Sequence, residues 1–397
     1  MVISLNLFLT TATAVLVLLV GDFIKKRAEI LRKFCIPIPV IGGLIFTILL
    51  SIGYTMNIFT FKFNFVLSDF FMTAFYSSIG FTASYKLLKK GGPKVIKFLI
   101  ISIIVVIFQN FLGVYLAKAL GLNPLVGLAT GSIPMTGGHG TSAAFAPVLE
   151  EAGLANAATI SLAAATFGLV AGSLTGGPVG KFLIEKYNVA TGKKQGYTDH
   201  KETIENESEK IDEKRIYSAV YQLLISMALG TVISMLLKKI GFTFPASVGA
   251  MIAAAIVRNI ADYSPYLEIK ETEIRIMGDI SLIIFLAFSM MGLKLWQLTE
   301  LAIPMIILLI AQTILMVICA VFLTFKYMGK NYEAVMMAVG HCGFGLGAVP
   351  TAMANMQSIE EKYGPEPSAF FILPLVGSLF INFFNSIIIV TFINMYS

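Results

Sequence analysis

The stretch GSIPMTGGHGTSAAFAP, residues 131–147, interrupts the long apolar segments on both sides of it. Four glycines and two prolines make a continuous helix unfavourable, and a strand still less favourable. Non-helical backbone cannot face lipid, because each unsatisfied amide or carbonyl group costs roughly several kcal/mol there. It is tolerated at membrane depth only where it lines a cavity or packs inside protein. The stretch therefore predicts a buried break in a membrane segment.

The composition is that of an integral membrane protein. Of 397 residues, 57% are hydrophobic and 13% are charged, whereas soluble domains contain about 25% charged residues. The apolar runs approach the length of about 20 residues that crosses a bilayer as a helix, and they lack the alternation of barrel strands. The predicted class is an all-α polytopic membrane protein. Ten spans are predicted, at residues 3–22, 36–53, 66–84, 97–118, 156–179, 217–237, 243–261, 277–293, 302–325 and 369–394.

Three parts of the chain fall outside these spans. Two irregular apolar segments, at about 124–150 and 333–356, are interrupted by glycine and proline. The long polar stretch contains TGKKQGYTDHKETIENESEKIDEKR and predicts a solvent-exposed linker. The predicted organisation is a first five-helix unit at 1–180, a cytoplasmic linker at 181–215 and a second five-helix unit at 216–397.

The distribution of lysine and arginine predicts the orientation. With the linker in the cytoplasm, 24 of the 29 basic residues lie on the inside and 5 on the outside. This asymmetry follows the positive-inside rule. It predicts a location in the cell (inner) membrane, with both termini on the outer, periplasmic side. It also accounts for the net charge of +6 without a nucleic-acid partner.

The two units contain weakly matching motifs in the same order. PVIGG at Pro39 matches PASVG at Pro245, and the GSL at Gly172 matches the GSL at Gly377. The irregular segments also occupy corresponding positions. Because each unit has an odd number of spans, the second must be inverted relative to the first. Inverted repeats with broken helices in matching places are typical of secondary transporters and indicate the binding site.

Each irregular segment is predicted to form a re-entrant hairpin of two short helices, with the two tips meeting near mid-membrane. A glycine tip exposes backbone N–H groups at the positive end of a half-helix dipole, which suits a carboxylate. Free carbonyl and hydroxyl oxygens nearby suit sodium. Substrate contacts are predicted at Thr136, Gly137, Gly138, His139, Gly140, Thr141 and Ser142 in the first segment and at Gly343, Gly345, Gly347 and Thr351 in the second.

Four polar residues in the spans are candidate Na⁺ contacts: Ser173, Thr175, Asn382 and Asn385. The two asparagines are three residues apart, so both can face one side of a helix. Membrane hydroxyl groups also bond their own helix readily, which is the alternative role for the serine and the threonine. His139 and His341 are candidate proton carriers or, alternatively, histidines satisfied by neighbouring backbone.

Carboxylates are absent from the centres of the predicted spans. Asp69 and Asp279 lie near the predicted starts of two spans, where helix capping is expected. This pattern disfavours a proton relay of membrane carboxylates and suits an anionic substrate held by backbone donors. The three cysteines, Cys35, Cys319 and Cys342, have no paired or metal-type spacing. No organic cofactor is expected.

The segments GSIPMTGGHGTSAAFAPVLEEAG and GHCGFGLGAVPTAMANM closely resemble the paired signature regions of bacterial sodium/glutamate symporters. The resemblance covers nearly the whole chain. It implies Na⁺-driven uptake of L-glutamate, with Na⁺ as the coupling ion, and an elevator-like motion of a hairpin-bearing core against a scaffold, within a homodimer. Val349 stands where many relatives are expected to have threonine, which bears on the sodium site.

Other functions remain open on the residues alone. A sodium-coupled carrier of di- or tricarboxylates could share this architecture, because the sequence does not distinguish recognition of an α-amino group from recognition of a hydroxyl group. A sodium/proton antiporter is disfavoured by the missing mid-membrane carboxylates. An intramembrane enzyme would use His139 or His341, but no nucleophile–acid set or metal-ligand cluster accompanies them.

Overall fold

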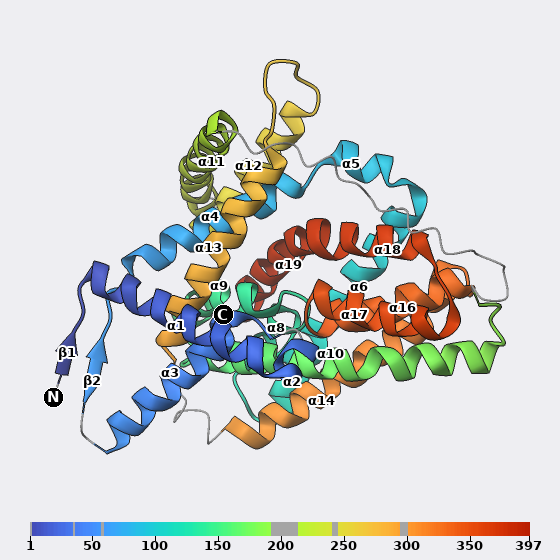
Figure 1. The fold of residues 1–397 in the computed structure, drawn as a ribbon, viewed down its shortest axis with the longest axis horizontal. Helices are drawn as coiled ribbons and strands as arrows, with labels where there is room; N and C mark the ends of the chain where they lie inside the picture. The colour runs from blue at the N-terminus through green and yellow to red at the C-terminus, as the bar shows by residue number, and fades with distance from the viewer. Residues whose placement is uncertain (1, 35, 57–58, 192–212, 240–244, 294–300) are drawn as a thin grey trace.

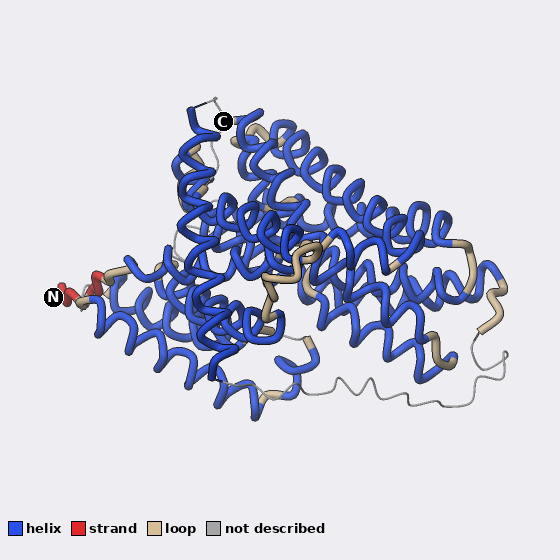
Figure 2. The backbone as a smooth tube through the Cα atoms, turned by 90° about the horizontal axis from the view of Figure 1, so that it is seen from above, coloured by secondary structure: helices blue, strands red, loops and turns tan. Residues whose placement is uncertain are grey.

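The computed structural model describes residues 2–34, 36–56, 59–191, 213–239, 245–293 and 301–397. Cys35 and most of the predicted linker lie outside these residues. Almost all of the described chain is helical (Figure 2). Two short strands, β1 (Val2–Ser4) and β2 (Thr60–Lys62), pair in parallel with Val2 opposite Thr60. The first predicted span is therefore wrong at its start, because the helix begins at Leu7 and not at residue 3.

One set of helices, here called the scaffold group, lies on the left of Figure 1. Within it, α4 packs on α12 and α13, α3 packs on α1 and α13, and α11 packs on α12. The group consists of α1 (Leu7–Arg27), α3 (Ile38–Thr55), α4 (Val66–Thr82), α11 (Glu213–Lys239), α12 (Ala246–Ala261) and α13 (Glu271–Met291).

The remaining helices other than α2 and α5, here called the core group, contain both irregular segments. From the first half they are α6 (Gly92–Ala119), α7 (Pro124–Ala129), α8 (Ser132–Met135), α9 (Gly138–Glu151) and α10 (Ala157–Tyr187). From the second half they are α14 (Ala302–Cys319), η3 (Ala320–Phe325), α15 (Lys326–Met328), α16 (Tyr332–Leu346), α17 (Val349–Tyr363), α18 (Pro367–Pro374), η4 (Leu375–Phe380) and α19 (Ile381–Tyr396). The turns η3 and η4 are π-helical, and η4 directly follows Pro374.

The helical spans confirm a polytopic membrane protein. In the described residues, 7 helices are long and apolar enough to cross a membrane. They correspond to seven of the ten predicted spans. The other three are the shorter helices α3, α4 and α12, of 18, 17 and 16 residues.

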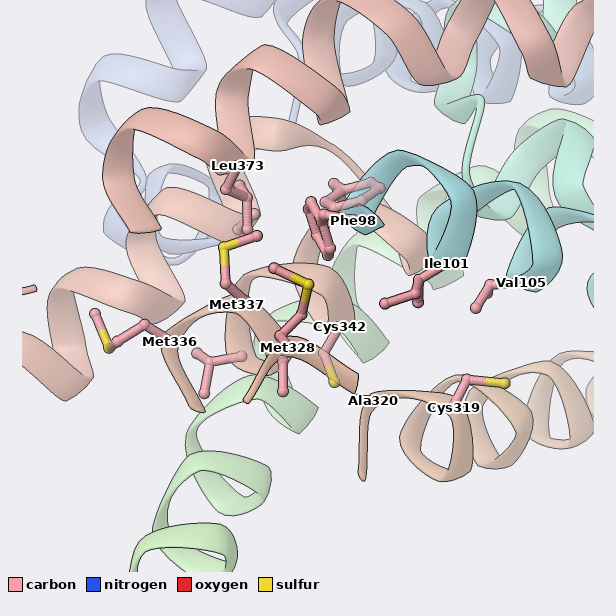
Figure 3. Close-up of a cluster of buried hydrophobic side chains, with 14 of the residues drawn as sticks. Phe98, Ile101, Val105, Cys319, Ala320, Met328, Met336, Met337, Cys342 and Leu373 are labelled. Carbon is pink, nitrogen blue, oxygen red and sulfur yellow. The ribbon is translucent and has the colours of Figure 1, made fainter. Parts of the chain in front are cut away.

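The core group is organised around α16. Every residue of this helix is buried. Most of them are apolar, and the charged Glu333 pairs with Lys94 of α6. Figure 3 shows Met336, Met337 and Cys342 of α16 in a cluster with Phe98 and other apolar side chains. The second irregular segment is therefore held inside protein.

Two short helices complete the described chain, α2 (Glu29–Lys33) and α5 (Tyr85–Lys90). α5 connects the scaffold helix α4 with the core helix α6. Its start is fixed to the scaffold, because Ser84 donates a hydrogen bond to Asp262, and the backbone N–H of Tyr85 donates to Oδ1 of Asn259 at 2.8 Å. The predicted linker is shorter than expected at both ends, since α10 continues to Tyr187 and α11 begins at Glu213.

Candidate functional site

Each irregular segment is a pair of helices separated by a short break. In the first, Thr136 and Gly137 separate α8 from α9, and an additional break precedes α8. In the second, Gly347 and Ala348 separate α16 from α17. The non-helical parts are narrower than the predicted tips, because 138–142 belong to α9 and 343–346 belong to α16.

The two breaks lie against each other. Gly138 adopts φ +65, a conformation that favours glycine. A Cβ atom at Gly138 would lie 3.0 Å from the carbonyl oxygen of Gly347. The backbone of one segment thus contacts the backbone of the other, and glycine is required there for both conformation and space.

A single buried side chain hydrogen-bonds both segments. Nε2 of Gln109, on α6, donates to the carbonyl oxygen of Gly345 at 2.7 Å, and Oε1 accepts from the hydroxyl of Thr136 at 2.7 Å. The backbone carbonyl of Gln109 in turn accepts a hydrogen bond of 2.7 Å from Nε2 of Gln312, on α14. Both glutamines are fully buried. The amide of Gln109 therefore fills the space between α6 and the two breaks.

Helix α10 packs on the second segment through glycines at four-residue spacing. These are Gly168, Gly172, Gly176 and Gly180. A Cβ atom at Gly168 would lie 2.1 Å from the carbonyl oxygen of Leu346. Nδ2 of Asn355, on α17, donates to the carbonyl oxygen of Gly172 at 2.9 Å. The stripe allows close backbone approach, as in other membrane helix pairs, and it supports the break from one side.

Two of the predicted substrate contacts have buried hydroxyl groups without a partner. Ser142 on α9 and Thr351 on α17 are fully buried, and neither hydroxyl has a hydrogen-bond partner among the described residues. Thr351 lies four residues before Asn355, so it shares the helix face that packs on α10. Buried polar groups are normally hydrogen-bonded, so each hydroxyl is available to a ligand.

Both histidines are paired with a threonine on a neighbouring helix. Nε2 of His139 lies 3.0 Å from Oγ1 of Thr166, and Nδ1 of His341 lies 2.8 Å from Oγ1 of Thr324. The ring of His341 also stacks on Phe344 at 4.8 Å between centroids. Their partners are side-chain hydroxyls and not the backbone groups that were the alternative expectation. These contacts account for both rings without a catalytic role.

The four candidate Na⁺ contacts occupy different surroundings. Ser173 and Thr175 donate to carbonyl oxygens of their own helix, those of Leu169 and Gly172. Asn385 is fully buried and exchanges hydrogen bonds with Ser132 of α8, at 2.7 and 3.2 Å.

Asn382 is half-buried and donates only weakly, to the carbonyl oxygen of Ser378 in the preceding turn η4, at 3.5 Å. The two asparagines of α19 therefore differ, and only Asn385 bonds an irregular segment.

A cavity of about 770 Å³ lies between the scaffold and core groups. On the scaffold side it is lined by the start of α4 and the end of α13, and on the core side by the end of α9 and the start of α10. The α9 residue of its lining that is nearest the break in sequence is Ala143. One turn earlier, Gly140 packs against Leu282 and Phe75 of the scaffold. The cavity thus runs along α9 to within two helical turns of the break.

The sequence reasoning missed the glutamine pair and misplaced one carboxylate. Gln109 and Gln312 are separated by 203 residues, close to the spacing of the matching motifs, and this was the available signal. Asp279 does not cap a helix, because α13 begins at Glu271. It lies exposed two turns inside that helix, so the expectation of spans without an interior carboxylate is wrong at this position.

The family comparison and the sequence comparison with known proteins identify the same family. The family described as sodium/glutamate symporter matches residues 3–365. The sodium/glutamate symporter of Escherichia coli (strain K12) is 38% identical over 397 residues, which cover 97% of this chain and 96% of that protein. The sodium/glutamate symporter of Haemophilus influenzae is 38% identical over 387 residues, covering 95% and 94%. Among solved structures, a sodium proton antiporter from Methanocaldococcus jannaschii is 17% identical, with a TM-score of 0.43 and coverage of 99% and 97%.

Proposed function

The chain belongs to the sodium/glutamate symporter family, and from this premise we propose that it carries L-glutamate into the cell together with Na⁺. It is a transporter and not an enzyme. The proposed site lies where α8–α9 meets α16–α17. The observation that carries this placement is the direct backbone contact of Gly138 with Gly347, because it joins two helix breaks inside the protein.

The proposed substrate contacts are backbone donors at two helix starts. α9 begins at Gly138 and α17 begins at Val349, and the first turn of a helix leaves N–H groups without an intrahelical partner. Residues 124–149 and 334–359 contain no Asp, Glu, Lys or Arg. The carboxylates of glutamate would therefore meet helix dipoles and hydroxyl groups rather than a fixed cation.

The same absence of charge supports coupling to sodium. A buried anion is costly unless it is paired, and a co-bound cation supplies the missing positive charge. Na⁺ prefers oxygen ligands, and the hydroxyl groups of Ser142 and Thr351 are buried without a partner in the described part of the chain. The C-terminal end of α16 adds the negative end of a helix dipole. Ser173, Thr175 and Asn385 remain proposed contacts around this point. Asn382 is the weakest candidate, because no hydrogen bond connects it with either segment.

We further propose that transport moves the core group against the scaffold group, as an elevator. The most extensive contacts between the groups join α9 with α13, α19 with α4 and α12, and η4 with α4, and Tyr76 of α4 also packs on Phe145 of α9. The cavity beside α9 already separates the groups along part of their boundary. The side chains that meet across the rest of the boundary are largely apolar, such as Phe285 of α13 and Phe145 of α9, so the groups can slide without breaking many directional bonds.

The helix contacts also support the proposed inverted repeat. The pairing of α4 with α12 has a counterpart in α13 with α3, and that of α1 with α3 has a counterpart in α11 with α12. Each counterpart exchanges one half of the chain for the other. With five spans in each half, the proposed topology has both termini outside the cell membrane and the linker in the cytoplasm. A homodimer, implied by the resemblance, would join the fixed scaffold groups.

Uptake into proteoliposomes tests the proposed function. Purified protein should accumulate labelled L-glutamate under an inward sodium gradient and lose this accumulation when choline replaces sodium. In counterflow, unlabelled L-glutamate should exchange with the label and citrate should not. Citrate counterflow without glutamate counterflow would assign the protein to a different carboxylate, and uptake that is equal in choline would remove sodium coupling.

A further inference from the structure

The C-terminal end of α16 has carbonyl groups that need hydrogen-bond donors from outside the helix, and Gln109 supplies one of them. The last carbonyl groups of a helix have no intrahelical partner. Near the end of α16, the carbonyl oxygen of Gly343 accepts the N–H groups of Gly347 and Ala348. The carbonyl oxygen of Gly345 instead accepts the side-chain amide of Gln109 at 2.7 Å. A residue from α6 thus completes the hydrogen bonding of the second break.

The other end of the same amide reaches the first break. Oε1 of Gln109 accepts the hydroxyl of Thr136, which immediately precedes the Gly137–Gly138 junction. A carboxamide group is planar and rigid, so its donor and acceptor atoms keep a fixed separation. A shift of either break must therefore move the amide or break one of its two hydrogen bonds. In a fully buried position, breaking one leaves an unpaired polar group, which is costly.

We propose that Gln109 is a positioning residue that couples the two breaks of the site, so that sodium binding to the paired breaks raises their affinity for glutamate. This inference rests on the proposed function and adds the residue through which coupling acts. Gln312 helps to hold Gln109 in place, because its Nε2 donates a hydrogen bond of 2.7 Å to the backbone carbonyl oxygen of Gln109.

The proposal makes a prediction about affinities that a purely structural role does not share. Coupling is the ratio of the glutamate Kd at limiting sodium to that at saturating sodium, and linkage requires the same ratio for sodium binding. Gln109→Met keeps the size of the side chain and removes both hydrogen bonds. We expect the Kd at limiting sodium to stay within about twofold of wild type and the Kd at saturating sodium to rise about tenfold.

The experiment is a glutamate titration of the purified full-length protein in lipid nanodiscs, with choline keeping the ionic strength constant. Thr136→Val removes only one of the two hydrogen bonds and serves as the milder variant if Gln109→Met does not fold. The double variant should lose no more coupling than Gln109→Met alone, because both changes break one connection. Gln222→Met, on scaffold helix α11, is the matched control and should leave both Kd values unchanged.

The outcomes separate this inference from the proposed function. An equal rise of both Kd values in Gln109→Met, or unchanged coupling, overturns the role of Gln109 while leaving sodium-coupled transport in place. A wild-type protein whose glutamate Kd is the same in sodium and choline contradicts the proposed function itself. Selective loss of the sodium effect in both Gln109→Met and Thr136→Val supports the coupling residue.

Discussion

Gly138 is the residue at which the two irregular segments constrain each other. Its φ of +65 and the 3.0 Å approach of its missing Cβ to Gly347 are independent requirements for glycine. The positive φ is a requirement of the local backbone, whereas the close approach to Gly347 is a requirement of tertiary packing. Other glycines share only the first requirement, so the two can be separated by experiment.

Gly138→Ala should lower sodium-dependent glutamate uptake by about tenfold, because the new methyl group pushes the two breaks apart. Gly121→Ala is the matched control: Gly121 has φ +72, but no described atom outside its immediate chain neighbours lies within 4 Å of its Cβ position. The strain of a left-handed alanine, about 1 kcal/mol, is common to both variants. Equal uptake by the two would mean that the contact of the breaks does not matter for transport.

Thr351→Val tests the unpartnered hydroxyl of α17. If this oxygen binds Na⁺, its loss should raise the sodium concentration for half-maximal uptake by about fivefold or more, with little change in protein stability, since the hydroxyl makes no hydrogen bond to any described residue. Thr313→Val is the control, because the hydroxyl of Thr313 only bonds Leu309 of its own helix. An unchanged sodium dependence in Thr351→Val would exclude this hydroxyl from the sodium site.

At this scale the sequence predicts residues inside the breaks better than those around them. Thr136, Ser142 and Thr351 each lie within four residues of a glycine of the irregular segments in the printed sequence. The structure places all three in a break or within five residues of one. Gln109 stands in an unbroken apolar helix, where one polar residue has many explanations. The role of Gln109 depends on which helices pack against α6, and a local sequence pattern does not predict this packing.

Among the elements, α10 is the helix whose glycines have the clearest packing purpose. Its four-residue stripe faces α16 and α17, and the backbone of Leu346 occupies the space where a side chain at Gly168 would lie. Glycine costs about 1 kcal/mol in a helix relative to alanine. The close approach must therefore more than offset that cost at each glycine of the stripe.

Gly168→Ala should destabilise the protein by about 1–3 kcal/mol, because its methyl group would lie 2.1 Å from a backbone oxygen that cannot rotate away. Gly177→Ala on the same helix should be neutral or stabilising by up to about 1 kcal/mol, since no described atom within 4 Å opposes its methyl group. Thermal unfolding followed by intrinsic fluorescence compares the two. A Gly168→Ala protein as stable as wild type would contradict the packing of α10 on the break.

The helices themselves followed from hydrophobic length, but the extent of the breaks did not. GHCGFGLG in residues 340–347 is poor in helix formers, yet it continues α16 as far as Leu346. Burial on all sides and the hydrogen bond from Gln109 outweigh the intrinsic cost of its glycines. Similarly, β1 and β2 were missed because each is three residues long and pairs only across the fold.

At the scale of the whole molecule, the cavity and the loops make the proposed topology testable. Ser289 lines the cavity at the end of α13, which the topology places outside. Tyr263, 70% exposed after α12, is placed in the cytoplasm. A single cysteine at each position, in a Cys35→Ala background, can be labelled with a membrane-impermeant maleimide; the two other native cysteines are buried.

Ser289→Cys should react in intact cells, and its rate should fall when sodium and L-glutamate shift the core group. Tyr263→Cys should react only after permeabilisation. The reverse pattern would invert the topology, and a Ser289→Cys rate that is insensitive to ligands would count against movement along this boundary.

The central claim is that one site, made by both breaks, binds glutamate and sodium. A cryo-EM map of the protein in lipid nanodiscs with Na⁺ and L-glutamate tests it most directly. We predict glutamate density in contact with the first turns of α9 and α17, beside the Gly138–Gly347 contact. Ordered glutamate elsewhere, such as in the cavity between the scaffold and core groups with the two breaks still packed together, would contradict it.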